Sequence, residues 1–172
     1  MPYVSIDELE HFEYHDAEVV NIELEDQSMI WITKWINATK ENTQNSFQID
    51  MCVAEAKVIF ETVAIKRIIF GEYGIFNANH EYIQLEKPRE ANPSEFATIL
   101  NDSLSKYCRI HGMGMEKAPA DGKHKYSVTF TIDGGAGVFD ILLDFDRAVI
   151  SWNEFNGKAW YEDEKWKKKR DL

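Results

Sequence analysis

The sequence has no apolar run of the roughly 18 residues that a membrane-spanning helix needs, and no secretion signal follows Met1. It has only two cysteines, Cys52 and Cys108, and they match neither a disulfide framework nor the CxxC spacing of a zinc or redox motif. These absences argue against the membrane and disulfide-rich secreted classes. We therefore expect a cytoplasmic protein without membrane association and with reduced, half-buried thiols.

Basic residues are absent from the first 26 positions, which hold nine Asp or Glu. The chain has a formal net charge of −11, whereas residues 165–172 form a basic tail around Lys165–Arg170. A field of this sign repels nucleic-acid phosphate and attracts cationic partners. We expect no nucleic-acid binding outside the tail, and we expect a basic protein partner.

Large apolar side chains are abundant for a chain of this length. Of the 172 residues, 44% are hydrophobic and 13% are aromatic, which is enough to bury a core without metal or disulfide support. No repeat is evident, and the connection at 111–125 is too short to separate two domains. We predict a single domain over residues 1–172.

Two capping-box patterns predict helices. Ser5 and Glu8 predict a short N-terminal helix over residues 6–12. Asn92-Pro93-Ser94-Glu95 predicts the start of the main amphipathic helix, near residues 93–108. Behind it, apolar residues recur at helical spacing: Phe96, Ile99, Leu100, Leu104 and Tyr107.

Alternating patterns predict about seven to eight strands. Val20, Ile22 and Leu24 form the apolar face of one strand, and Met29–Ile36 is predicted to be a central strand covered on both faces. Ala54–Lys57 remains open between helix and strand. Further strand candidates are 47–53, 58–60, 65–70, 82–85 and a meander of 126–132, 138–145 and 148–152. The predicted fold is α+β with a largely antiparallel sheet. A sandwich-like packing of this sheet is one possible arrangement.

Two of the five histidines, His11 and His15, lie four residues apart among carboxylates. On a continuous helix this spacing lets two imidazoles bind one metal, with Glu13 or Asp16 as a further ligand. The strand pattern that begins near Val19 argues against such a helix. A third ligand would otherwise have to come from His80, His111, His124 or a distant acid.

We therefore interpret this stretch as a helix-to-strand junction, where His15 and Asp16 satisfy backbone groups on an acidic face. A metal-dependent or hydrolytic enzyme that uses His11, His15 and Asp16 is kept as an alternative. We expect no cofactor. The predicted partner-binding residues are Glu8, Glu10, Glu13, His15, Asp16 and Glu18.

Three other patterns carry weaker chemical signals. Gly134–Gly137 runs from strand to strand, which indicates a hairpin turn and not a phosphate loop. Cys108 and His111 supply the minimum of a nucleophile and a base, but proximity along the chain is weak support. The C-terminal aromatic residues are Trp152, Phe155, Trp160, Tyr161 and Trp166, of which we expect the first two in the core.

The motif Phe12-x-x-His15-Asp16-Ala17, followed by an amphipathic strand and a turn, resembles the start of several uncharacterised small bacterial families. Some of these are described as immunity proteins of toxin systems. The resemblance covers about the first 30–40 residues, implies a cytoplasmic binding protein and assigns no catalytic residue. The prediction is a non-enzymatic, immunity-like inhibitor of a basic partner, with an accessory structural domain as a further alternative.

Overall fold

The computed structural model describes residues 2–117, 119 and 122–163. Within these residues sixteen strands form three antiparallel sheets, together with one α-helix and three 3-10 turns. The α+β class and the largely antiparallel sheet are confirmed, although the strands are about twice as many as predicted. No helix in the described parts is long and apolar enough to cross a membrane. The predicted basic tail, 165–172, lies outside the described residues.

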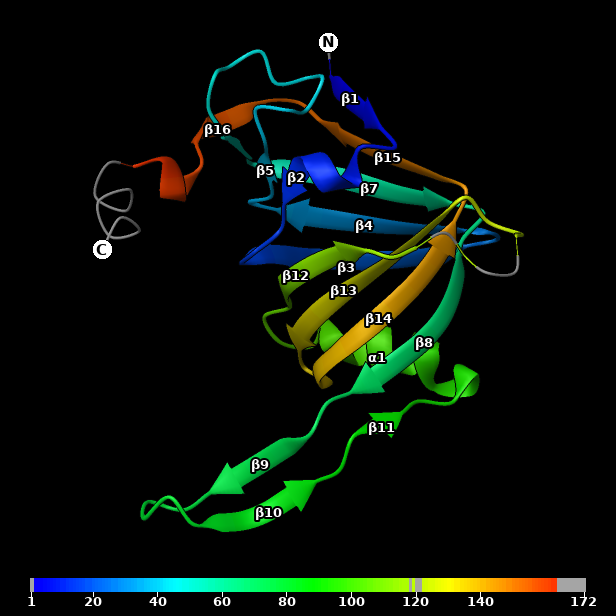
Figure 1. Cartoon of the computed structure of the whole chain (residues 1–172), viewed down its shortest axis with the longest axis vertical. Helices are drawn as coiled ribbons and strands as arrows, with labels where there is room; N and C mark the ends of the chain where they lie inside the picture. The colour runs from blue at the N-terminus through cyan, green and yellow to red at the C-terminus, as the bar shows by residue number, and fades with distance from the viewer. Residues whose placement is uncertain (1, 118, 120–121, 164–172) are drawn as a thin grey trace.

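The largest sheet forms the body of the molecule (Figure 1). Its described strands, in their order across the sheet, are β1 (Tyr3–Ile6), β15 (Arg147–Trp152), β7 (Glu55–Glu61), β4 (Ser28–Lys34), β3 (Ala17–Glu25), β12 (Arg109–Met115), β13 (Tyr126–Gly134), β14 (Gly137–Phe145), β8 (Ala64–Phe70) and β11 (Arg89–Glu90). The second sheet consists of β16 (Phe155–Lys158), β6 (Met51–Val53), β5 (Asn37–Ala38) and β2 (Phe12–Glu13), and the third of β9 (Tyr73–Phe76) and β10 (Tyr82–Glu86).

The large sheet bends so that its two halves face each other across the core. In Figure 1, β15, β7, β4 and β3 run across the view, whereas β12, β13, β14 and β8 run diagonally. The ring centroids of Trp31 in β4 and Phe130 in β13 lie 4.9 Å apart, and those of Phe60 in β7 and Phe145 in β14 lie 5.3 Å apart. All four rings are fully buried. An aromatic core therefore joins the two halves of the sheet.

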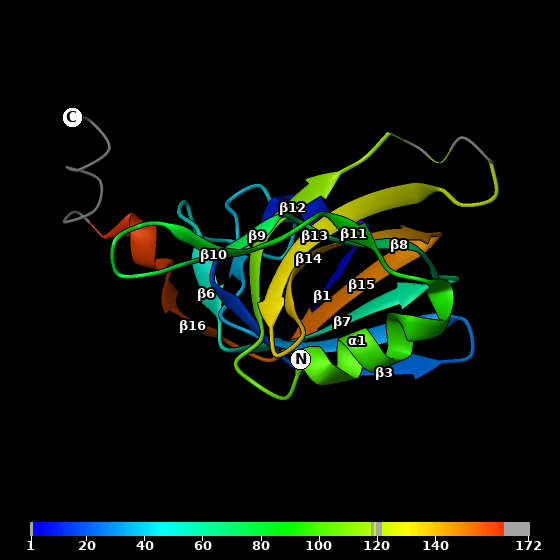
Figure 2. The ribbon, with the colours of Figure 1, turned by 90° about the horizontal axis from the view of Figure 1, so that it is seen from below.

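The helix α1 (Phe96–Ser103) follows a 3-10 turn, Pro93–Glu95, and lies along one side of the strands (Figure 2). Asn92 and Glu95 form the predicted capping box. Among the predicted apolar positions, Phe96, Ile99 and Leu100 are buried, whereas Tyr107 is exposed and stacks on Arg109. The helix ends at Ser103, earlier than predicted, because the chain then joins the sheet, where the Cys108 carbonyl accepts a hydrogen bond from Val19 N–H.

The N-terminal helix predicted over residues 6–12 is wrong. Residues Tyr3–Ile6 form β1, a 3-10 turn covers Leu9–His11, and β2 starts at Phe12. Ser5 donates to the Glu8 carboxylate, but Ile6 pairs with Val149 of β15 and Asp7 has a left-handed φ of 57°. Pairing with a distant strand therefore overrides the local helix signal.

Two strand predictions also need correction, and the segment left open at Ala54–Lys57 is decided. A bulge at Val20 shifts the inward face of β3, so that Val19 instead of Val20 is buried before it, whereas Ile22 packs against the core after it as predicted. Leu24, near the end of the strand, is half exposed. Glu55–Lys57 belongs to β7 and is not helical. The hairpin of β13 and β14 forms as predicted, but β15 pairs with β7 and β1 and does not continue the meander.

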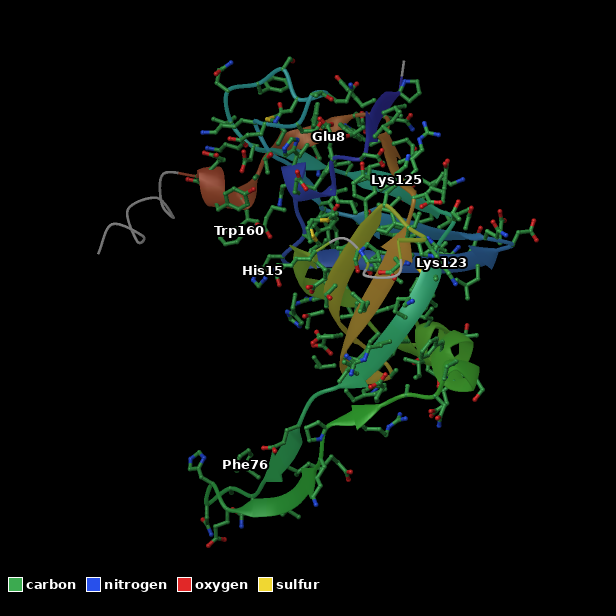
Figure 3. All side chains as sticks on the ribbon, turned by 45° about the vertical axis from the view of Figure 1, so that its right-hand side comes forward. Glu8, His15, Phe76, Lys123, Lys125 and Trp160 are labelled. Carbon is green, nitrogen blue, oxygen red and sulfur yellow. The ribbon has the colours of Figure 1, made fainter. Side chains whose placement is uncertain are left out.

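The hairpin of β9 and β10 extends away from the large sheet (Figure 1). It exposes three apolar side chains, those of Ile75, Phe76 and Ile83. Figure 3 shows Phe76 on the hairpin at the lower end of the view and His15 near the middle, so the hairpin is separate from the surface described next.

Candidate functional site

An open groove of about 560 Å³ lies where β2 of the second sheet approaches β12 of the large sheet. We call it the acidic groove and define it by its lining residues, Glu13, His15, Thr39, Asp50, His111, Trp160 and Tyr161. Figure 3 shows His15 and Trp160 as neighbours on the same side of the molecule. The groove therefore joins the N-terminal acidic stretch to the C-terminal aromatic residues.

A tight turn presents His15 and Asp16 at the rim of this groove. The Ala17 N–H donates to the Tyr14 carbonyl at 2.9 Å, and Asp16 has a φ of 65°, a region that Asp tolerates better than most residues. The Asp16 N–H donates to the Ile110 carbonyl at 3.0 Å, which ties the turn to β12. Because the backbone is held from both sides, the two side chains point outward, each 52% exposed.

The second imidazole beside His15 belongs to His111, 96 positions away, and not to His11. The His15 Nδ1 lies 2.9 Å from the His111 carbonyl oxygen, and the His15 Nε2 lies 3.6 Å from an Asp16 oxygen. His111 occupies a bulge in β12, and its Nε2 lies 3.2 Å from Asp133 Oδ2. Since the helix needed for a His11–His15 pair does not form, the metal set kept as an alternative, His11, His15 and Asp16, is not assembled.

Glu8 was predicted to face a partner, but its carboxylate holds the N-terminal segment to the loop after β5. Its side chain is only 14% exposed, and it accepts hydrogen bonds from Ser5, Asn42 and Thr43. Burial would raise the Glu8 pKa, but the hydrogen bonds from Ser5 and Thr43 outweigh it and lower that pKa below its usual value. The His11 Nδ1 lies 3.6 Å from the same carboxylate.

The remaining predicted partner residues are divided between different surfaces. Glu13 lines the acidic groove, and its Oε1 accepts the His15 N–H at 2.9 Å. Glu10 is exposed and lines a different hollow with Asp7 and Leu9. Glu18 lies within the large sheet between Lys34 of β4 and Arg109 of β12. Of the six residues, only Glu13 and His15 line the acidic groove, with Asp16 beside them.

Asp50, a further acidic residue of the groove, was not among the residues predicted from the sequence. Asp50 accepts hydrogen bonds from the Lys40 N–H and the Tyr161 hydroxyl, both at 2.9 Å. Burial and the hydrogen bond to Asp50 raise the Tyr161 pKa above its usual range, so this hydroxyl remains a donor. The Ala159 N–H donates to the Asp50 carbonyl and so fixes the next residue, Trp160, whose side chain is 49% exposed. The only sequence signal was the cluster of C-terminal aromatic residues.

Cys108 does not form a nucleophile and base with His111. The cysteine is 1% exposed, and burial, with smaller contributions from Asp133 and Glu18, raises its thiol pKa to about 11. A thiol in this state is protonated at neutral pH. The His111 ring faces Asp133 instead.

No protein-family model matches this chain, and no match was found among curated proteins or solved structures.

Proposed function

We propose that the acidic groove binds a basic segment of a protein partner and that the protein is a non-enzymatic, immunity-like inhibitor of that partner. The observation that carries the proposal is the meeting of the Glu13 and Asp50 carboxylates with the exposed Trp160 side chain in one groove. These groups come from three separate parts of the chain. Two carboxylates and an aromatic ring are complementary to the cationic side chain of lysine or arginine.

The Glu13 and Asp50 carboxylates can accept more hydrogen bonds than they receive within the protein. Each Asp50 oxygen accepts one hydrogen bond, and Glu13 accepts one from His15 N–H, whereas an ionised carboxylate offers about four lone-pair sites. The seven described residues that line the groove include no lysine or arginine. A guanidinium or ammonium group in the groove would therefore meet carboxylate oxygens with remaining lone pairs, and Trp160 offers an aromatic face to a cation.

The whole-molecule charge supports the same function. A net charge of −11 speeds encounter with a basic partner and makes that encounter sensitive to salt. An inhibitor of this kind acts by covering the basic surface of the partner, so it requires no catalytic group of its own.

The proposal can be tested with a fluorescently labelled peptide of alternating Arg and Gly, titrated with the full-length protein and followed by fluorescence anisotropy. A peptide of alternating Glu and Gly is the reference. We expect binding of the Arg peptide only, weaker at high ionic strength. Glu13→Gln should weaken it about two- to five-fold, the usual effect of one exposed charge pair. Trp160→Leu should weaken it to a similar extent, and Trp160→Phe less, because phenylalanine retains an aromatic face.

The matched control is Glu25→Gln, which removes an equal charge from an exposed residue outside the groove. It should leave the affinity nearly unchanged. Equal losses for Glu13→Gln and Glu25→Gln would show that only net charge attracts the peptide. Failure of the Arg peptide to bind at low ionic strength would refute recognition by the groove.

A further inference from the structure

We propose that His15, Asp16 and His111 bind a divalent transition-metal cation, for which Zn²⁺ is the test ion, at the rim of the acidic groove. This inference is independent of the proposed function, because it concerns different ligand atoms and requires no protein partner.

The three side chains are already close to a coordinating arrangement. One ligand atom from each lies within 4.8 Å of the others, and they are the only such group among the residues that the structure describes. The His15 Nε2 and the nearest Asp16 oxygen are 3.6 Å apart. Two ligands of a tetrahedral zinc ion are roughly 3.3 Å apart at normal bond lengths. The His15 and Asp16 side chains are exposed and therefore have room to rotate toward one ion.

The tautomer of His15 suits a metal ligand. Its Nδ1 lies 2.9 Å from the carbonyl oxygen of His111, and a carbonyl can only accept a hydrogen bond. In the neutral ring the proton is therefore on Nδ1, which leaves the lone pair on Nε2. That nitrogen is the one beside Asp16.

The second histidine is oriented by a carboxylate. The His111 Nε2 lies 3.2 Å from Asp133 Oδ2, a residue on the neighbouring strand β13. A carboxylate that accepts a hydrogen bond from one ring nitrogen while the other binds metal is the common support of metal-bound histidine. With Nε2 donating to Asp133, Nδ1 is the nitrogen available to a cation.

The backbone that carries the ligands is fixed before any ion binds. Asp16 N–H donates to the Ile110 carbonyl, and Ala17 pairs with Ile110 across β3 and β12. The bulge at His111 turns that residue out of the regular strand register. Two imidazoles and one carboxylate favour Zn²⁺, Co²⁺, Ni²⁺ or Cu²⁺ over Mg²⁺ and Ca²⁺, which prefer oxygen ligands. Three protein ligands also leave one position for water.

The test is isothermal titration calorimetry of the untagged, full-length protein with ZnCl₂. We expect one Zn²⁺ per chain, and loss of this binding in His15→Ala and in His111→Ala. Asp133→Asn should keep the site but weaken it about ten- to a hundred-fold, as expected for a supporting carboxylate. His80→Asn, which changes an exposed histidine outside the group, should bind like the wild type.

Because a variant can lose Zn²⁺ binding by misfolding, a second measurement uses the wild type. In the wild type, Zn²⁺ should shift the imidazole NMR signals of His15 and His111 and leave those of His80 and His124 in place. Absence of stoichiometric Zn²⁺ binding by the wild type would overturn the inference. Binding that survives His15→Ala, or signal shifts confined to other histidines, would overturn it as well.

Discussion

Neighbouring residues in the acidic N-terminal stretch lie in different environments and have different roles. Glu8 is largely buried and joins three polar side chains, whereas Glu13, five positions later, opens into the acidic groove. His15 and Asp16 stand between these two environments and the strand that follows, on a turn fixed by backbone hydrogen bonds. A uniform acidic face, as the sequence suggested, does not describe this stretch.

At the residue scale, Glu8→Gln should lower the free energy of unfolding at pH 7 by about 1–2 kcal/mol, because a largely buried, charge-assisted network loses its anion. Folding lowers the Glu8 pKa, so its stabilisation is present above the unfolded value near 4.5 and is lost as the pH falls below it. Urea denaturation should thus show a difference in the free energy of unfolding between wild type and Glu8→Gln that is larger at pH 7 than below pH 4.5. Glu10→Gln is the control, and a difference independent of pH would contradict this role.

The elements that the sequence predicted well are those with local signals. The capping box at Asn92 starts the helical segment, and the glycines after Asp133 form the turn of the β13–β14 hairpin. Strand β12 was missed because its sequence, RIHGMGM, contains two glycines and little alternation; it is a strand because β13 and β3 lie on either side. Pairing between distant segments cannot be read from a local pattern.

The candidate site was predictable to the same partial extent. The motif around His15 and Asp16 drew attention to the turn that now forms part of the candidate site, since a histidine among carboxylates is a local feature. His111 was one of three histidines named as a possible third ligand, but only the β12 pairing singles it out. Asp50 was not predicted, because the chain brings it to the groove only through the small sheet. The groove is thus a product of topology.

At the element scale, the turn between β13 and β14 should tolerate no side chain where it meets α1. A Cβ atom on Gly135 would clash with Ser105 Oγ and with the Asp102 carbonyl oxygen. We expect Gly135→Ala to lower the free energy of unfolding by about 1–3 kcal/mol through this overpacking. Gly114→Ala is the matched control, because its Cβ would meet nothing within 4 Å. Equal thermal stability of the two variants would contradict this prediction, because it would show that the end of α1 moves to make room for the added Cβ atom.

At the scale of the whole molecule, the bent sheet brings the two ends of the described chain to one surface. The N-terminal segment pairs with β15 and then forms β2 of the small sheet, whose other edge strand, β16, leads to Trp160. Acidic residues from the first part of the chain therefore meet aromatic residues from the last part. The strong negative charge acts over the whole surface, but this is the place where it combines with an aromatic side chain.

The central claim, that the acidic groove recognises a basic protein, is tested most directly by affinity capture from a lysate of the source cells at low ionic strength. We predict that the wild type retains a basic protein that high salt releases, that Glu13→Gln/Asp50→Asn loses it, and that Glu25→Gln/Glu55→Gln, with the same charge change outside the groove, keeps it. Retention of the same protein by the groove variant, or its equal loss from both variants, would contradict the claim.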